Sequence, residues 1–512
     1  MNINFTHRRH NKFNFDYLIV IFLGIANSFS LPPYNYFFLN FLCFPALFLI
    51  LCKNKIYKKK SFFIGWFFGF GYFFSSLYWI SNSLTFLEDY KFLIPFSLCL
   101  IPACLALFYG LITIFLSLFN IQKNLSSLMI FSVGFSLIEF LRGIILTGFP
   151  WNLNVYSLTE FTKLIQILSV VGTYGLNLIC ITFFLIPLVI LFEKKLKFKI
   201  SVFSIFLLIF TLNYIYGHLR IDNYNKNETK SLNTQIKIIS PKIDLNRFLN
   251  NEDPIVRIDE IYKISDPNKD LNTLFIFPEG ILTGVSLQNQ KYLSYLFKNR
   301  YSSNHKLLIG MNIVEDSKVY NSLVLFNNEL EPIDIYKKNK LVPFGEYLPI
   351  EKILSKFGLK KITQGYQSFS PSNIRNIIEL DYFSILPLIC YEIIYSGNLS
   401  KNKNYYDVIV NISEDGWFGD SIGPFQHFSH SILRSIEEGK NLIRSANNGI
   451  SALISPVGLI ENKIESTESG VIEFNTVKSI NTTIFSKHGN KIFFYLMLFY
   501  ITLIFFLKKK GH

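Results

Sequence analysis

Charged residues are scarce in this chain of 512 residues, at 17% of the total, whereas 50% are hydrophobic and 17% aromatic. A water-soluble protein usually has about a quarter of its residues charged. The scarcity is uneven, because residues 1–217 and 491–512 hold long apolar runs and residues 218–490 have the composition of a globular domain. We therefore expect a membrane region of seven spans, a large extramembrane domain and a C-terminal span with a short tail.

Cysteine is also scarce, with six residues, and no CxxC pair or histidine-rich cluster offers the spacing of a metal site. Five of the six lie in the apolar part, where a thiol usually packs as a small hydrophobic group. Cys390 is the only cysteine within residues 218–490 and so has no disulfide partner in that domain. Neither a metal nor another cofactor is expected.

Basic residues outnumber acidic ones, giving a formal net charge of +14. They occur in short clusters beside apolar runs, such as Arg8-Arg9, Lys58-Lys59-Lys60 and Lys508-Lys509-Lys510. This placement is typical of membrane orientation signals, and no basic helix or stacking surface for nucleic acid is present. We expect a membrane as partner and no nucleic acid.

Eight apolar runs are long enough to cross a membrane, at about residues 15–31, 34–52, 61–81, 92–119, 125–146, 164–192, 200–217 and 491–507. If all eight span, the basic connections lie on one side: the N-terminus and residues 53–60, 120–124, 193–199 and 508–512. The positive-inside rule makes that side cytoplasmic. We expect a multi-pass bacterial inner-membrane protein with residues 218–490 in the periplasm.

Glu139 and Arg142 lie three residues apart in the fifth run, on one face of a helix. Intramembrane charges are costly, so they are usually paired or functional. A structural ion pair near the interface is the favoured interpretation, and a contact with lipid headgroups is the alternative.

The extramembrane domain alternates β-type runs with polar or helical stretches, which is typical of an α/β sheet. The runs include residues 273–277, 307–314, 322–326, 383–390 and 408–412. Functional side chains in such folds lie at strand ends, and three of these ends carry reactive groups.

Glu279 directly follows an apolar strand, where partial burial would raise its pKa toward that of a general base. The segment 336–346 contains three lysines, any of which could stabilise an oxyanion. Cys390 ends an apolar strand and begins a polar segment, as a nucleophile elbow does. Taken singly, each has a simpler interpretation: a strand-terminating Glu, a solvated lysine cluster and a buried free thiol.

Together, the order Glu, Lys, Cys resembles the nitrilase, or carbon–nitrogen hydrolase, superfamily. The resemblance implies an α/β αββα sandwich with Glu279 as base, Lys338 as oxyanion-stabilising cation and Cys390 as nucleophile. Lys338 is chosen among the lysines because the family pattern is Tyr-x-Lys, here Tyr336-Lys337-Lys338.

The sequence is more similar still to the membrane-bound branch of that superfamily, the apolipoprotein N-acyltransferases. Residues 341–347 look like this family's loop, and imply Glu346 as a supporting carboxylate. The Cys390-Tyr391-Glu392 stretch matches its nucleophile motif and adds Tyr391 and Glu392 to the site. Further similar stretches are residues 146–151, 411–419, 423–427 and 444–449.

Two aromatic residues complete the expected site. The family usually has a tryptophan near residues 239–248, and Phe248 stands in that region here. Trp417 is expected either to line a mouth that opens at the bilayer surface or to be buried in the domain core.

The resemblance implies transfer of an acyl chain from a phospholipid, through a thioester on Cys390, to the α-amino group of a lipoprotein's N-terminal diacylglyceryl-cysteine. Two alternatives remain at this point. A membrane-tethered amidase would release free acid from small amides. A transporter or receptor with an outer binding domain would keep its function in Cys390→Ser.

Overall fold

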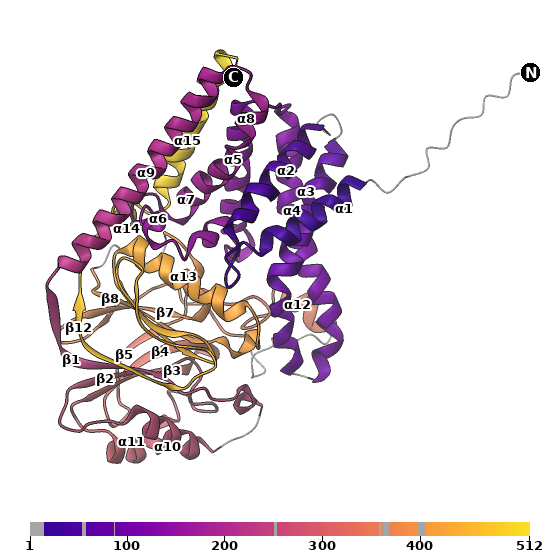
Figure 1. Cartoon of the computed structure of the whole chain (residues 1–512). Helices are drawn as coiled ribbons and strands as arrows, with labels where there is room; N and C mark the ends of the chain where they lie inside the picture. The colour runs from indigo at the N-terminus through magenta and orange to yellow at the C-terminus, as the bar shows by residue number, and fades with distance from the viewer. Residues whose placement is uncertain are drawn as a thin grey trace, which may run out of the picture.

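The computed structural model describes residues 15–53, 58–86, 88–249, 253–357, 361, 368–397, 399 and 405–511. Arg8 and Arg9, the expected N-terminal orientation signal, lie outside these residues. Figure 1 shows a bundle of helices at one end of the molecule and two β-sheets at the other, so the chain has the two-part architecture expected from its composition.

Within the described residues, six helical segments are long and apolar enough to cross a membrane, and two further apolar helices are shorter. The six are Lys58–Phe86, which contains α3 (Lys58–Leu77), Glu88–Leu118, which contains α4 (Ile94–Leu118), α5 (Leu125–Arg142), α7 (Leu168–Leu185), α9 (Leu196–Lys226) and α15 (Lys491–Lys509). The two shorter segments are α1 (Phe15–Ser28) and Phe37–Lys53, which contains α2 (Asn40–Lys53). All eight fall, in order, on the eight predicted runs.

Two predicted runs differ from the helices in extent. The sixth run is divided into α6 (Thr162–Ile165), α7 and α8 (Leu188–Phe192), with Gln166-Ile167 and Ile186-Pro187 between them, and α7 itself leaves helical geometry at Gly172. The seventh run continues nine residues past its predicted end as α9, whose last turns are polar. The end of an apolar run marks the expected edge of the lipid. The helix itself can continue beyond that edge.

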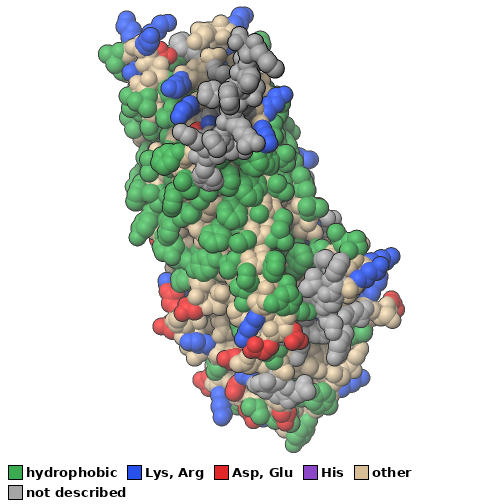
Figure 2. All heavy atoms as spheres, turned by 90° about the vertical axis from the view of Figure 1, so that its right-hand side faces the viewer, with side chains coloured by type: hydrophobic (Ala, Val, Ile, Leu, Met, Phe, Trp, Pro, Cys, Tyr) green, Lys and Arg blue, Asp and Glu red, His purple; other side chains and the backbone are tan. Residues whose placement is uncertain are grey.

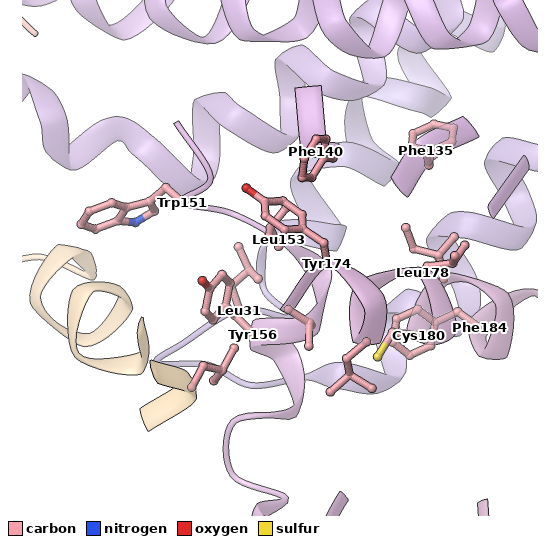
Figure 3. Close-up of a cluster of buried hydrophobic side chains, with 14 of the residues drawn as sticks. Leu31, Phe135, Phe140, Trp151, Leu153, Tyr156, Tyr174, Leu178, Cys180 and Phe184 are labelled. Atoms are coloured by element: carbon pink, nitrogen blue, oxygen red, sulfur yellow. The ribbon is translucent and has the colours of Figure 1, made fainter. Parts of the chain in front are cut away.

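The helices pack closely through small residues and aromatic rings. A Cβ added at Gly24 of α1 would lie 2.1 Å from the carbonyl oxygen of Phe68 in α3, so the two backbones touch there. Small residues permit such contact between membrane helices. Figure 3 shows part of the aromatic core beside them, in which Phe140 lies next to Tyr174.

Basic side chains mark the end of the bundle away from the sheets. Lys60 at the start of α3 pairs with Asp16 of α1 at 3.0 Å. Lys508 at the end of α15 lies 6.0 Å from the ring centroid of Phe119, which follows α4. Figure 2 shows a broad band of hydrophobic side chains between this basic end and the part of the surface with both charge signs.

The other end of the molecule is built from two six-stranded sheets. The first has the order β12 (Gly470–Lys478), β1 (Thr229–Ser240), β2 (Thr273–Ile276), β3 (His305–Glu315), β4 (Lys318–Phe326) and β5 (Pro332–Lys337). The second has the order β11 (Ile460–Ile464), β10 (Ser451–Ile454), β9 (Asn441–Asn447), β8 (Val408–Glu414), β7 (Ser384–Ile389) and β6 (Ile378–Glu379). The central strands β1–β2–β3 and β7–β8–β9 run parallel, which brings their carboxyl ends to one edge.

The sheets face each other across an apolar core that includes Ile276 and Leu308 of the first sheet and Ile412 and Ile443 of the second. Helices α10 (Pro254–Ser265) and α11 (Ser294–Arg300) cover the outer face of the first sheet. Helix α13 (Gly423–Glu438) lies on the second. This confirms the predicted αββα sandwich.

Helix α13 lies between the second sheet and the membrane helices, as Figure 1 shows. All of its residues except Phe425 are buried, although its sequence is largely polar. Its hydrophobic side chains share one core cluster with those of the membrane helices, and it contacts α7 directly. The two-sheet sandwich therefore packs on the membrane bundle through this helix.

Candidate active site

The three residues predicted to be catalytic lie at three strand ends. Glu279 follows β2, Lys338 follows β5, and Cys390 follows β7 and begins the short helix η9 (Cys390–Ile394). The Nζ atom of Lys338 lies 3.7 Å from Oε1 of Glu279. The thiol of Cys390 interacts electrostatically with both side chains. The structure thus brings together groups that are 59 and 52 residues apart in sequence.

Cys390 has a left-handed backbone conformation, with φ of +47°. Such values are uncommon for residues other than glycine, and they cluster at functional sites where the surroundings enforce them. Asn411 donates from Nδ2 to the Cys390 carbonyl oxygen at 3.4 Å, and Nε2 of His427 lies 3.3 Å from the same oxygen. The residue is half-buried, whereas the strand before it is buried, and this strand-to-helix position is that of a nucleophile elbow.

Lys338 is almost completely buried, with 1% of its surface exposed. Its ammonium group donates to Oε1 of Glu346 at 2.9 Å. Burial by itself lowers the pKa of Lys338, but the carboxylates of Glu346 and Glu279 outweigh burial and raise it. The side chain is therefore a permanent cation held in a low-dielectric site, where it can stabilise an oxyanion strongly.

Glu279 accepts a hydrogen bond at Oε1 from Asn321 Nδ2 at 2.7 Å and one at Oε2 from the Glu414 backbone N–H at 3.2 Å. Burial raises the pKa of Glu279, and the Lys338 cation only partly offsets that effect. A carboxylate in this state takes up a proton more readily than an exposed one does, as a general base must.

The Cys390 thiol is likewise held in its neutral form. Burial raises its pKa, the Glu279 carboxylate raises it further, and Lys338 acts in the opposite direction. A thiol of raised pKa is a weak nucleophile until a base removes its proton. The site therefore pairs a neutral thiol with a carboxylate that can accept its proton as the reaction proceeds.

Glu346 holds the Lys338 cation in place and is itself fixed by hydrogen bonds from two further groups. It accepts from Lys338, from Asn321 Nδ2 at 2.8 Å and from the Val342 backbone N–H at 2.8 Å. The predicted supporting carboxylate is therefore in direct contact with the predicted oxyanion-stabilising cation.

Asn321 was not predicted from sequence, although one amide group joins Glu279 to Glu346. The available signal was a polar amide inside β4 among hydrophobic neighbours. Its hydrogen bonds hold two carboxylates on either side of one ammonium group. We infer that it keeps Glu279 oriented toward the thiol.

Replacing Asn321 by aspartate puts a third carboxylate beside Glu279 and Glu346, with one cation to offset them. We expect turnover at this site to fall by about 10- to 100-fold, because a displaced base loses that much of its effect. Turnover by purified Asn321→Asp measures this, with Asn327→Asp in the half-buried turn after β4 as control. Equal activities of the two variants would contradict the assigned contact.

Glu392 joins the segments that carry the triad. Its carboxylate accepts from the Ile389 N–H at 2.9 Å, before the nucleophile, and from the Asn339 N–H at 2.9 Å, next to Lys338. Tyr336 and Arg375 donate to the same group at 2.8 and 3.1 Å. Glu392 thus fixes the strand end of the thiol relative to that of the cation.

Tyr391 turns away from the triad and toward the membrane half. Its hydroxyl donates to the Gly148 carbonyl oxygen at 2.9 Å, and its ring lies parallel to that of Phe149 with centroids 6.5 Å apart. Tyr395, one helical turn on, donates to the Thr147 carbonyl at 3.1 Å. Residues next to the nucleophile therefore meet the turn that follows α5.

The two predicted aromatic residues contact each other at the boundary between the two halves. The Trp417 ring lies 5.3 Å from the ring of Phe248 and 5.7 Å from that of Phe86, which belongs to the membrane half. Phe248 covers Gly280, where an added Cβ would lie 2.6 Å from its ring. Trp417 and Phe248 are partly exposed, so neither is a core residue.

Side chains from three of the family-like stretches meet next to Cys390: residues 411–419, 423–427 and 444–449. Arg444 pairs with Asp415 at 2.7 Å, and Nδ1 of His427 lies 2.9 Å from the same carboxylate. Burial opposes ionisation of Asp415, yet Arg444 outweighs it and holds the pKa of Asp415 below its usual range. This fully buried cluster supports the backbone at Cys390. The sequence alone had given Asp415, His427 and Arg444 no role.

Comparison with known proteins identifies the class to which the two-sheet sandwich belongs. Residues 272–476 match the carbon–nitrogen hydrolase family model. A solved CN-hydrolase superfamily protein from Xanthomonas campestris aligns with 52% of this chain and 97% of its own, with 15% identity and a TM-score of 0.35. The sandwich is a carbon–nitrogen hydrolase domain.

The membrane half and the whole chain identify the family. Residues 23–186 match the model of the apolipoprotein N-acyltransferase N-terminal domain. The apolipoprotein N-acyltransferase of Rickettsia typhi is 33% identical over 96% of this chain and 99% of the relative. That of Rhizobium etli is 28% identical over 96% of each chain. The chain belongs to the apolipoprotein N-acyltransferase family, and is a multi-pass membrane acyltransferase of lipoprotein biosynthesis.

Proposed function

We propose that this acyltransferase carries the acyl chain on Cys390 as a thioester, between a phospholipid donor and the N-terminal diacylglyceryl-cysteine of a lipoprotein. The observation that carries the proposal is the meeting of a base, a fixed cation and a thiol at three strand ends. Glu279 and Lys338 are 3.7 Å apart and both act electrostatically on Cys390.

In the first half-reaction, Glu279 takes the thiol proton while Sγ of Cys390 attacks the ester carbonyl carbon of the phospholipid. Lys338 stabilises the negative charge that develops on the carbonyl oxygen. The S–C bond forms, the ester C–O bond breaks, and the proton on Glu279 passes to the departing alcohol oxygen. The products are a lysophospholipid and the Cys390 thioester.

In the second half-reaction, the α-amine of the diacylglyceryl-cysteine attacks the thioester carbonyl. Glu279 accepts a proton from the nitrogen, the C–S bond breaks, and the proton returns to Sγ. An N-acyl amide is released and the thiol is restored. Because one carboxylate serves as base and then as acid in each half, its raised pKa suits both steps.

We further propose that residues 218–490 form a periplasmic domain, between spans in residues 1–217 and a last span in residues 491–512. Basic side chains at the opposite end of the bundle support this, since that end is cytoplasmic by the positive-inside rule. α9 leads directly into β1 of the first sheet, and the chain returns from β12 through α14 (Ile484–His488) into α15. Both connections lie on the sheet side.

This orientation is tested with single cysteines placed at opposite ends. Tyr405 on the sandwich is 72% exposed, and Lys510 follows α15 at the basic end. A membrane-impermeant maleimide applied to spheroplasts is expected to label Tyr405→Cys at once and Lys510→Cys only after lysis. The reverse pattern would place the catalytic domain in the cytoplasm.

The activity itself is tested in vesicles that hold the purified protein, acyl-labelled phospholipid and a diacylglyceryl-cysteine peptide. We expect labelled N-acyl peptide and an equal amount of lysophospholipid. Hydrolysis of small amides without lipid would favour a membrane-tethered amidase. Full function of Cys390→Ser in cells would favour a transporter or receptor.

A further inference from the structure

The turn after α5, residues 147–152, lies between the intramembrane ion pair and the surroundings of the nucleophile. Glu139 and Arg142 are both buried, each with 1% of its surface exposed. The Nε of Arg142 donates to Oε2 of Glu139 at 2.8 Å, and the Tyr109 hydroxyl donates to the other carboxylate oxygen. The pair is an internal one, as favoured from sequence, and does not face lipid headgroups.

Arg142 also holds the turn itself. Its guanidinium donates to the carbonyl oxygen of Phe149 and, at 3.4 Å, to that of Asn152. In return the Phe149 N–H donates to the Arg142 carbonyl at 2.9 Å. The planar guanidinium bonds the carboxylate with two of its nitrogens and still reaches two carbonyls, a fork that the single nitrogen of a lysine does not offer.

The turn has a conformation that few sequences allow. Gly148 has φ of +85°, and a Cβ added there would lie 2.0 Å from the carbonyl oxygen of Gly143. With that geometry fixed, the Gly148 carbonyl accepts the Tyr391 hydroxyl, and Phe149 packs parallel to the Tyr391 ring.

A second contact runs from the same turn to the backbone of the nucleophile. The Trp151 ring stacks on His427 with centroids 5.2 Å apart and an interplanar angle of 26°. Nε2 of His427 lies 3.3 Å from the Cys390 carbonyl oxygen. Figure 3 shows Trp151 extending from the aromatic core of the helices toward the catalytic part of the chain.

We propose that Arg142 is a positioning residue for acyl transfer: through the turn 147–152 it fixes Tyr391 and His427, which flank Cys390. This rests on the proposed role of Cys390 as the nucleophile. A buried charge in the membrane is costly to keep, so an ion pair there is expected to have a function beyond packing. Here the function is to place the elbow correctly relative to the membrane half.

The chain contains a matched control. Arg434 and Glu437 of α13 form a second buried ion pair with the same three-residue spacing, at 3.0 Å and with no exposed side-chain surface. The Arg434 guanidinium donates to Thr173 of α7, and Glu437 accepts from the Thr173 N–H at 2.6 Å. This pair joins the same two halves of the molecule at a different place.

The test compares Arg142→Gln with Arg434→Gln in phospholipid vesicles, by single-turnover acylation of Cys390 at several phospholipid contents. We expect Arg142→Gln to lower the maximal acylation rate about 10- to 100-fold, the effect of a small misplacement of reacting groups, with an unchanged half-saturating phospholipid content. Arg434→Gln is expected to keep its rate within about threefold, although both variants lose thermal stability.

Tyr391→Phe alone tests the same contact if Arg142→Gln is poorly folded, and a double-mutant cycle of the two tests it if Arg142→Gln folds. Tyr391→Phe removes only the hydroxyl that reaches Gly148, and we expect it to slow acylation by itself. Because both residues act through one turn, the double variant should be little slower than the slower single variant.

The proposal would be overturned by equal slowing in both arginine variants, by a change confined to the half-saturating phospholipid content, or by additive effects in the cycle. Failure of the proposed function is distinguishable, because the unchanged protein would then form no acyl adduct at Cys390. Normal acylation of both the unchanged protein and Arg142→Gln would defeat the positioning role alone.

Discussion

Cys390→Ala is expected to lower N-acyl transfer by about 10⁴-fold or more, since loss of a covalent nucleophile leaves only binding and charge stabilisation. The substitution removes one sulfur from a site in which the side chains of Asn411 and His427 contact the Cys390 backbone carbonyl. The fold should therefore persist, and a thermal unfolding scan should show a near-normal Tm. Formation of labelled N-acyl peptide in vesicles measures the loss.

The matched control is Cys99→Ala, because Cys99 is an exposed cysteine on α4, a membrane helix. Its activity should equal that of the unchanged protein. Comparable activity in Cys390→Ala and Cys99→Ala would show that no thioester lies on the pathway, and the amine would then attack the phospholipid directly.

Glu279→Gln is expected to slow acylation by about 10²- to 10⁴-fold, the usual contribution of a positioned general base. Glutamine keeps the size of the side chain and can still accept from Asn321, but it cannot take the thiol proton. Because the pKa of the Cys390 thiol is itself raised, little thiolate exists near neutral pH to bypass the base.

The same substitution should change the pH dependence of acylation. Burial raises the pKa of Glu279, so the carboxyl keeps its proton to a higher pH than an exposed one does. A base acts only when deprotonated, so the rate of the unchanged protein should rise with pH through that raised pKa and then level off. Glu279→Gln should lose this acidic rise.

Glu315→Gln provides a control of the same chemistry, because Glu315 pairs with Lys337, next to Lys338, at the exposed edge of the sheet. We expect it to keep both the rate and the pH profile. An acidic limb that survives in Glu279→Gln would assign that limb to another group and remove Glu279 from the role of base.

The broad architecture followed from sequence because it depends on local composition. Spans are set by the length of apolar runs, and strand ends by the change from apolar to polar residues. Glu279, Lys338 and Cys390 each lie at such a change, and their order is similar to that of a known superfamily. Strand boundaries agreed with the structure to within a few residues at most ends.

What sequence did not reveal depends on contacts between distant segments. Asn321 is an ordinary polar residue of β4 until β2 and the loop before Glu346 bring two carboxylates to it. Tyr391 belongs to the nucleophile motif, yet its partner is a backbone carbonyl 243 residues earlier. Helix α13 is polar by composition but buried, because it lies between the two halves, where Gln426 accepts from Trp151 and Arg434 donates to Thr173. Such pairings carry no local signal.

The central claim, a thioester on Cys390, is tested most directly by mass spectrometry of the purified protein after mixing with acyl-labelled phospholipid in a bilayer. The account predicts one labelled acyl group, located on the peptide that contains Cys390. Adding a diacylglyceryl-cysteine peptide should remove the label from the protein and yield an equal amount of labelled N-acyl peptide. Production of the N-acyl peptide with no labelled protein at any time, or a label at a residue other than Cys390, would contradict it.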